Sequence, residues 1–399
     1  MITRRELLRN AGLGAFAASV PAISFAEADT DARLVLVILR GAVDGLAVAA
    51  PYGDSKYRNV RGELAIDTPG STEGLLNLDG FFGLHPAMKN THDLYRNDQA
   101  LVVHAVASPY RERSHFDAQD VLENGSELAG GIRNGWLNRA LEPLGGSLGQ
   151  ESAIAMAQNT PLVLRGGNSV TSWAPSQLPD ANVDTLHRIE QLYAHDEFFA
   201  VRLRQAFDSQ DIAGNMGGMD GQRRNNELEQ WKILADAAAK FLTAADGPQI
   251  AVLEAGGWDT HANQGAAGGY LSNRLTALDE ALISLRRGLG NTWSKTVVAV
   301  VTEFGRTVKV NGTRGTDHGT ATAALLLGGA VSGGQVVADW PGLGSNDLYE
   351  GRDLYPTSDL RGIFKSILIE HLQLEEGFVT REVFPDSAFI RPLNGLIRS

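Results

Sequence analysis

The sequence predicts an α/β fold with a mainly parallel central sheet flanked by helices. Short, continuous apolar runs rich in β-branched residues are typical of strands buried on both faces. Stretches with helical periodicity lie between these runs, and strand followed by helix, repeated along the chain, indicates a parallel sheet. The apolar runs cover residues 33–39, 100–106, 153–157, 249–253, 296–301 and 323–327.

The helical patterns show how the expected domain is organised. They cover residues 85–96, 115–123, 183–206, 226–244, 267–289 and 359–372. A glycine-rich stretch at residues 208–222 interrupts one helical region, so we expect a helical insertion or cap over approximately residues 182–245. Because there is no internal repeat and no long linker, residues 29–399 are expected to form one elaborated domain.

Composition excludes several classes of protein. The 399 residues are 43% hydrophobic and 21% charged, which is ordinary for a globular protein with a sizeable core. A formal net charge of -12 argues against a nucleic-acid partner, because phosphate contacts require a basic surface. With no cysteine in the chain, any metal must be bound by Asp, Glu or His.

The first 28 residues have the pattern of a twin-arginine signal peptide. Arg4 and Arg5 precede a weakly apolar stretch that ends in small residues at Ala26 or Ala28. This pattern predicts export of the folded chain by the twin-arginine machinery to the periplasm or beyond. A Sec signal or a retained amphipathic helix is the alternative. No segment is long and apolar enough to predict a stable membrane span.

Acidic and imidazole side chains recur next to the ends of the predicted strands. Ligands of open α/β sheets bind beyond the carboxyl ends of the strands, so these side chains are expected to meet at one edge. Asp44 follows the first run in the sequence GAVDGL, where its alternative role is to cap the next helix. Asp259 and His261 follow the fourth run in GGWDTHANQ and can present an oxygen and a nitrogen to one cation. Their alternative is a helix cap and a surface histidine.

Three more candidate ligands flank the fifth and sixth runs. Glu303 ends the fifth run, where a half-buried carboxylate beside other carboxylates favours a bound cation. An ion pair with Arg306 is the alternative. Asp317 and His318 precede the sixth run, with His318 as a neutral imidazole ligand and Asp317 as a ligand or an orienting partner.

A candidate nucleophile lies in the sequence SPYRERSHFDAQD. Ser114 is at the expected start of a helix, where backbone N–H groups favour an anion or an attacking oxygen. Arg113 and Arg111 can bind a phosphate or sulfate group. The alternative is that Ser114 is only a helix cap. The same helix also carries His115.

The sequence phrases RGAVDGL, RERSHFDAQD, GGWDTHANQ, TEFGRT and DHGTA, with the N-terminal segment, resemble an exported family catalogued as domain of unknown function number 1501. That family is similar to the alkaline phosphatase superfamily of two-metal phospho- and sulfohydrolases. The resemblance therefore implies an alkaline-phosphatase-like fold.

The resemblance also implies roles for individual residues. Asp44 lies where the superfamily has its metal-binding Asp after the first strand, and Ser114 lies near its nucleophile. Glu254 with Asp259 resembles its pair of acidic ligands, and the other matching ligands are His261, Glu303 and His318. Phe304 differs from the pattern, because a metal ligand often stands there.

The favoured prediction is an exported hydrolase of small phosphate or sulfate esters that depends on a divalent metal. Asp44, Asp259, His261, Glu303, Asp317 and His318 are the expected metal ligands, and Ser114 and Arg113 are the expected catalytic residues. Zn²⁺ suits the imidazoles, whereas Mg²⁺, Mn²⁺ or Ca²⁺ suits the carboxylates. The alternative is a non-catalytic exported protein of the same fold that binds a partner or polymer.

Overall fold

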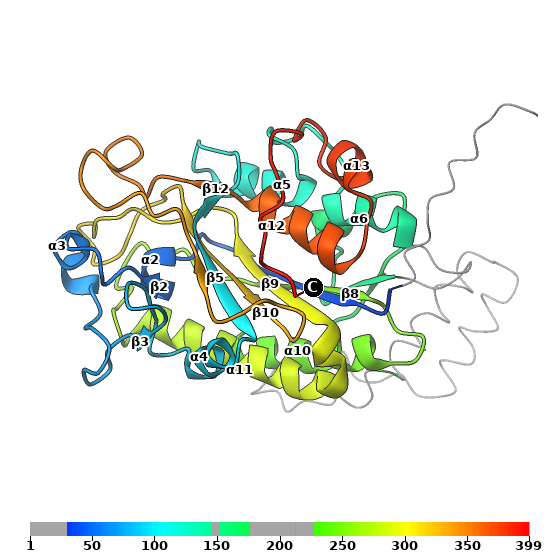
Figure 1. Ribbon diagram of the computed structural model, residues 1–399, viewed down its shortest axis with the longest axis horizontal. Coiled ribbons are helices and arrows are strands. Elements are labelled where there is room, and N and C mark those ends of the chain that lie inside the picture. Colours follow the sequence, from blue (N-terminus) through cyan, green and yellow to red (C-terminus); the bar gives the residue numbers. More distant parts are fainter. Residues whose placement is uncertain (1–29, 145–151, 176–211, 213–226, 399) are drawn as a thin grey trace, which may run out of the picture.

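The computed structural model describes residues 30–144, 152–175, 212 and 227–398. Within them, a nine-stranded sheet has the order β11-β5-β10-β9-β1-β8-β6-β7, and β12 also pairs with β5 (Figure 1). The strands are β1 (Arg33–Leu39), β5 (Ala100–Ala107), β6 (Ala153–Ala155), β7 (Thr171–Ser172), β8 (Ile250–Ala255), β9 (Thr296–Thr302), β10 (Thr322–Leu327), β11 (Val336–Val337) and β12 (Ser358–Asp359). The predicted α/β class with a mostly parallel sheet is confirmed.

Strand β10 is the exception to the parallel arrangement. The central strand β1 is parallel to β8 and β9, whereas β10 is antiparallel to both of its neighbours, β5 and β9. The connection from β9 to β10, residues 303–321, contains no helix, so the chain turns back at the edge where β9 ends. The start of β10 therefore lies at the carboxyl edge of the parallel strands.

Helices cover both faces of the sheet (Figure 1). One face carries α4 (Lys89–Arg96), α10 (Glu227–Thr243) and α11 (Tyr270–Leu289). The other carries α5 (His115–Asn124), α6 (Trp136–Ala140), α12 (Leu360–Ser366) and α13 (Glu376–Phe378), with π-helical turns η6 (Ile367–His371) and η7 (Val379–Val383). Val35 and Val37 of β1 pack into the first face, and Leu34 and Leu36 pack into the second. Burial on both faces explains the continuous apolar sequence of β1.

Smaller elements extend the fold beyond the sheet. A three-stranded sheet has the order β2 (Ala49–Ala50), β4 (Gly83–Leu84) and β3 (Leu76–Asn77). The short helices are α2 (Gly45–Val48) and α3 (Tyr57–Arg61), and the 3-10 turns are η1 (Gly62–Leu64), η2 (Glu142–Leu144), η3 (Leu162–Leu164) and η5 (Gly290–Lys295). Helix α3 carries Arg61, which forms a buried ion pair with Asp44.

Two sequence predictions fall largely outside the described residues. The N-terminal signal, residues 1–28, is one of them. Of the expected insertion at residues 182–245, the structure describes Ile212 and the part that contains α10, which packs on α11 and β8 as a layer of the main fold. In the described residues, no helix is long and apolar enough to cross a membrane.

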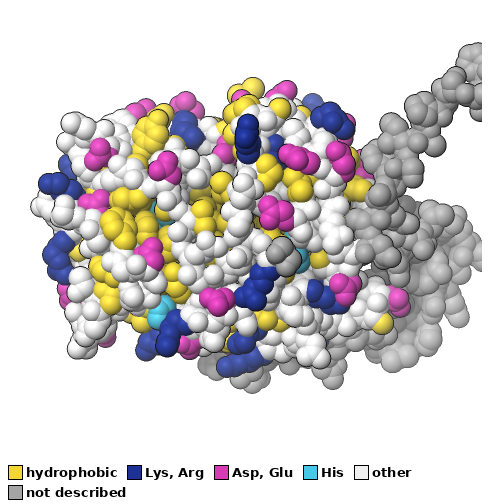
Figure 2. All heavy atoms as spheres, viewed as in Figure 1, with side chains coloured by type: hydrophobic (Ala, Val, Ile, Leu, Met, Phe, Trp, Pro, Cys, Tyr) yellow, Lys and Arg dark blue, Asp and Glu magenta, His cyan; other side chains and the backbone are white. Residues whose placement is uncertain are grey.

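Lys and Arg side chains are interspersed with Asp and Glu on the face drawn in Figure 2.

Candidate metal centre

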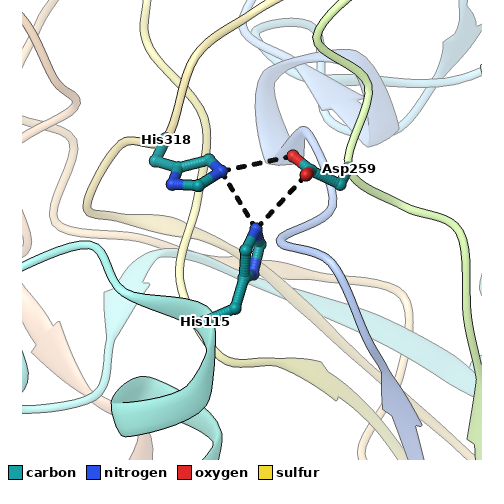
Figure 3. A group of neighbouring side chains, drawn as sticks. All are labelled: His115, Asp259 and His318. Carbon is teal, nitrogen blue, oxygen red and sulfur yellow. Dashed lines mark hydrogen bonds and ion pairs between the residues drawn. The ribbon is translucent and has the colours of Figure 1, made fainter.

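Four side chains from three separate loops meet at the carboxyl edge of the sheet. His115 begins α5 after β5, Asp259 and His261 follow β8, and His318 precedes the antiparallel β10. Figure 3 shows His115, Asp259 and His318 pointing toward one another. The ligand atoms of these three all lie within 4.8 Å of one another.

The Nε2 atom of His318 lies in the middle of this group. It is 3.0 Å from His115 Nε2, 2.9 Å from His261 Nε2 and 3.3 Å from Asp259 Oδ1. Asp259 Oδ1 is also 3.0 Å from His261 Nε2, and Asp259 Oδ2 is 3.5 Å from His115 Nε2. Donor atoms at about 2.0–2.1 Å from a tetrahedral Zn²⁺ lie about 3.3 Å from one another, so these separations suit one shared ion.

Each of the three imidazoles is fixed through its other nitrogen. The Nδ1 atom of His115 is 2.8 Å from Glu303 Oε1, that of His318 is 2.9 Å from the carbonyl oxygen of Arg113, and that of His261 is 3.3 Å from Asp317 Oδ1. An oxygen without a proton only accepts, so each Nδ1 carries a hydrogen, and in the neutral form of each imidazole the Nε2 atom keeps its lone pair. Three lone pairs that face one another repel unless a cation lies among them. This orientation is typical of histidines that bind metals.

Glu303 orients His115 from inside the protein. Its side chain is 0% exposed, and it accepts hydrogen bonds from His115, Gln119, the backbone N–H of Gly41 and the hydroxyl of Thr302. Burial would raise the pKa of the Glu303 carboxyl, but these hydrogen bonds outweigh burial and hold that pKa below its usual value. Glu303 is thus an anion whose oxygens are already used by protein groups.

Two acidic residues of the centre are held by neighbouring side chains, Asp259 by Arg306 and Asp317 by Asn311. Arg306 is almost completely buried, and its NH1 is 2.5 Å from Asp259 Oδ1. Burial opposes ionisation of Asp259, but the hydrogen bond and the charge of Arg306 prevail and lower the pKa of that carboxyl. The hydrogen bond from Asn311, 3.0 Å long, and the contact with His261 lower the pKa of Asp317. Both carboxyl groups are therefore ionised at neutral pH.

Phe304 forms an apolar wall beside the imidazoles. Its ring is stacked 4.9 Å from that of His115, centroid to centroid, and lies 5.3 Å from that of His318 at a tilt of 52°. Phe304 thus packs on two histidines and offers no ligand atom to the centre. It restricts how far both rings can rotate.

The structure places Asp44 in a different set of contacts. Its Oδ2 atom is bound by the Arg61 guanidinium and lies 2.7 Å from Gln264 Nε2. Both members of the Asp44–Arg61 pair are buried, at 1% and 0% exposure. The predicted ligand thus has a cation supplied by the protein, while its other oxygen, Oδ1, lacks a hydrogen-bond partner among the described residues.

Ser114 and Arg113 lie directly before His115 in the chain. Ser114 is the N-cap residue of α5, but its side chain makes no capping hydrogen bond. The Arg113 guanidinium is 2.8 Å from Asp353 and 2.6 Å from Glu350, so two carboxylates bind the group that was expected to hold an anion. Its backbone oxygen instead contacts His318.

Of the residues predicted as ligands, Asp259, His261 and His318 come together, and Glu303 and Asp317 contact ring nitrogens within the group. The sequence interpretation did not include His115 as a ligand. The same rule about strand ends could have found it, since His115 begins the first helix after β5. The sequence favours Glu303 as the ion-pair partner of Arg306 if no metal binds, but the structure pairs Arg306 with Asp259.

The fold and this centre define an α/β protein with a candidate metal site at the carboxyl edge of its sheet. The chain belongs to the family described as protein of unknown function (DUF1501), whose model matches residues 31–384. The predicted family is therefore confirmed. No protein of curated function matches the chain significantly.

Several solved structures are similar at low identity. A phosphonate monoester hydrolase of Agrobacterium radiobacter is 12% identical, with 86% of this chain and 74% of that chain covered and a TM-score of 0.38. A sulfatase from Pseudoalteromonas sp. is 12% identical, with 100% and 78% covered and a TM-score of 0.39. The structure of Ps i-CgsB in complex with k-i-k-neocarrahexaose is 10% identical, with 91% and 78% covered and a TM-score of 0.45.

Proposed function

We propose that this protein is an exported, metal-dependent hydrolase of phosphate or sulfate esters. The observation that carries the proposal is the convergence of three Nε2 lone pairs and one carboxylate, from His115, His261, His318 and Asp259. Neutral imidazoles whose Nε2 lone pairs face one another repel, and a divalent cation bound among them removes that repulsion. A divalent cation would neutralise the summed charge of four side chains, which are the carboxylates of Asp259, Glu303 and Asp317 and the guanidinium of Arg306.

The donor set favours one class of metal. Three imidazole nitrogens and one carboxylate oxygen suit Zn²⁺ and related first-row ions, whereas Mg²⁺ and Ca²⁺ prefer sites made of oxygen. When bound, such an ion supplies a positive charge that stabilises the oxygens of a phosphoryl or sulfuryl group in the transition state. Glu303 and Phe304 hold the ring of His115 in the orientation in which its Nε2 atom would bind the ion.

Ser114 is the proposed attacking group. It lies next to His115, at the N-terminus of α5, and its hydroxyl is not used as a cap. Attack by Ser114 Oγ on phosphorus or sulfur breaks the bond to the ester oxygen, and the proton lost by the Ser114 hydroxyl passes, through water, to the departing alcohol. A water molecule then cleaves the seryl ester, which releases phosphate or sulfate and restores the hydroxyl.

Export and the small anionic substrate are further parts of the proposal. The basic start and apolar stretch of residues 1–28 support transport by the twin-arginine machinery. Replacement of Arg4 and Arg5 together by Lys is expected to retain the precursor in the cytoplasm. Unchanged processing of this double variant would contradict the twin-arginine route.

Metal analysis and activity measured on the same sample test the hydrolase. Purified mature protein should contain about one equivalent of a first-row metal and should hydrolyse members of a panel of phosphate and sulfate esters. Ser114→Ala should abolish turnover but keep the metal, because only the attacking oxygen is removed. Unchanged turnover in Ser114→Ala would assign the attack to water or to Ser108.

A structural role for the ion is the second candidate function. Four protein donors are the number found in closed, structural Zn²⁺ sites, and the Arg113 guanidinium is bound by Asp353 and Glu350. This candidate describes a non-catalytic exported protein that binds a partner or polymer. Stoichiometric metal with no turnover of any ester in the panel, and a lower melting temperature after chelation, would favour it.

A further inference from the structure

Asp353 lies buried at the centre of a set of polar contacts next to the candidate metal centre. Its side chain is 0% exposed. It accepts hydrogen bonds from Arg113 Nε at 2.8 Å, from Arg352 Nε at 2.8 Å and from the hydroxyl of Thr320 at 2.9 Å. One buried carboxylate thus joins three segments of the chain.

Two of the three partners of Asp353 contact His318. The backbone oxygen of Arg113 accepts the hydrogen bond from His318 Nδ1, at 2.9 Å. Arg352 NH2 donates to the backbone oxygen of His318, at 2.6 Å, and Thr320 is two residues further along the chain. His318 is therefore held through its ring and through its backbone by residues that bind the same carboxylate.

The backbone of Arg113 needs such support. Its φ is 59°, in the left-handed region that residues other than glycine rarely adopt. The ion pairs of its side chain with Asp353 and Glu350 hold Arg113 in this conformation. The carbonyl that binds His318 Nδ1 belongs to this strained residue.

We propose that Asp353 is a positioning residue of the metal centre: by holding Arg113, Arg352 and Thr320, it fixes the tautomer and the orientation of His318. This role rests on the proposed metal-dependent function. Asp353 does not touch the reacting atoms; it acts through the residues that bind His318. It also gives the Arg113 side chain a function other than binding the substrate anion.

The test compares two buried aspartates in the full mature chain loaded with Co²⁺. Asp353→Asn removes the charge that binds both arginines. Asp279→Asn is the matched control, because Asp279 on α11 is also buried and accepts four hydrogen bonds, from Asn90 and Thr91. Chelator competition gives the Co²⁺ affinity, and the visible spectrum of the bound Co²⁺ reports on the geometry of its ligands.

Asp353→Asn is expected to lower the Co²⁺ affinity about 10- to 100-fold and to change the spectrum. Asp279→Asn should lower the melting temperature and leave both metal readouts as in the parent. If Asp353→Asn does not fold, Thr320→Val, which removes one hydrogen bond to Asp353, should weaken binding, and Thr320→Ser should restore it.

The positioning role would be overturned if Asp353→Asn and the parent had equal Co²⁺ affinity and equal spectra. If Asp353→Asn is unfolded, equal Co²⁺ affinity of the Thr320→Val and Thr320→Ser variants would overturn it. A parent protein that binds no Co²⁺ overturns both this role and the metal centre. A parent that binds Co²⁺ but hydrolyses no ester overturns only the proposed hydrolase.

Discussion

Two buried carboxylates at strand ends, Asp44 after β1 and Glu303 after β9, have different solutions to the same physical problem. Asp44 has a full positive charge beside it, because Arg61 is buried with it. Glu303 is bound by hydrogen-bond donors, chiefly His115, Gln119 and the backbone of Gly41. Asp259, the carboxylate that faces the Nε2 atoms of the imidazoles, is 40% exposed. Burial at a strand end therefore does not by itself identify a metal ligand.

The largest effect is expected on the stability of the protein when Asp44 is changed. Asp44→Asn leaves the Arg61 charge buried without its partner, which should lower the free energy of unfolding by about 3–5 kcal/mol. Denaturant unfolding measures this loss. The double variant Asp44→Leu, Arg61→Met should recover most of the stability, because neither charge remains. A metal affinity lowered together with stability in Asp44→Asn would instead join Asp44 to the metal centre.

On the other side, His318→Ala should remove a ligand and lower the metal affinity more than about 100-fold, beyond the effect of losing an orienting partner. Equilibrium dialysis followed by metal analysis measures it. His92→Ala, which changes a histidine on α4, is the control and should bind metal like the parent. Full metal content in His318→Ala would show that the three imidazoles do not share an ion.

Glu303→Gln should have a smaller effect on the same property. The amide keeps the size of the side chain but weakens its hold on His115 Nδ1, so the metal affinity should fall about tenfold. Glu123→Gln is a suitable control, because Glu123 is also buried but pairs with Arg40 and not with a histidine. A loss as large as that in His318→Ala would make Glu303 a direct ligand.

The smallest expected effect is on the stability of the protein in acid, and it comes from His104 of β5, which interacts with the charge of Asp44. Burial lowers the pKa of His104 to about 4. Between that pH and about 6.5 the unfolded state binds the proton and the folded state does not, so stability falls as pH falls through this window. From pH 7 to 5.5 this contribution amounts to about 1 kcal/mol. Denaturant unfolding across this range measures it, and His104→Gln should flatten the slope. An unchanged slope would assign the acid sensitivity to other groups.

Much of the fold could be predicted from local pattern. The run at residues 33–39 became β1 without any shift in its ends, because the six apolar residues that follow Arg33, all of them buried, are typical of a strand covered on both faces. The helix expected at residues 115–123 became α5, which ends at Asn124 and is followed by the C-cap residue Gly125 in the left-handed conformation. The direction of β10 could not be predicted in this way, because it depends on how the helix-free connection at residues 303–321 folds back.

The amino-acid sequence by itself determined the fold class, the family and the edge of the sheet where polar residues gather, since these follow from periodicity, motifs and strand ends. Only the tertiary structure decided the role of each polar residue. Arg61 reaches Asp44, Arg306 reaches Asp259, and the carbonyl of Arg113 reaches His318 across long stretches of sequence. Which nitrogen of a histidine faces a metal, and which carboxylate already has its cation, depends on such contacts, and spacing along the chain does not encode them.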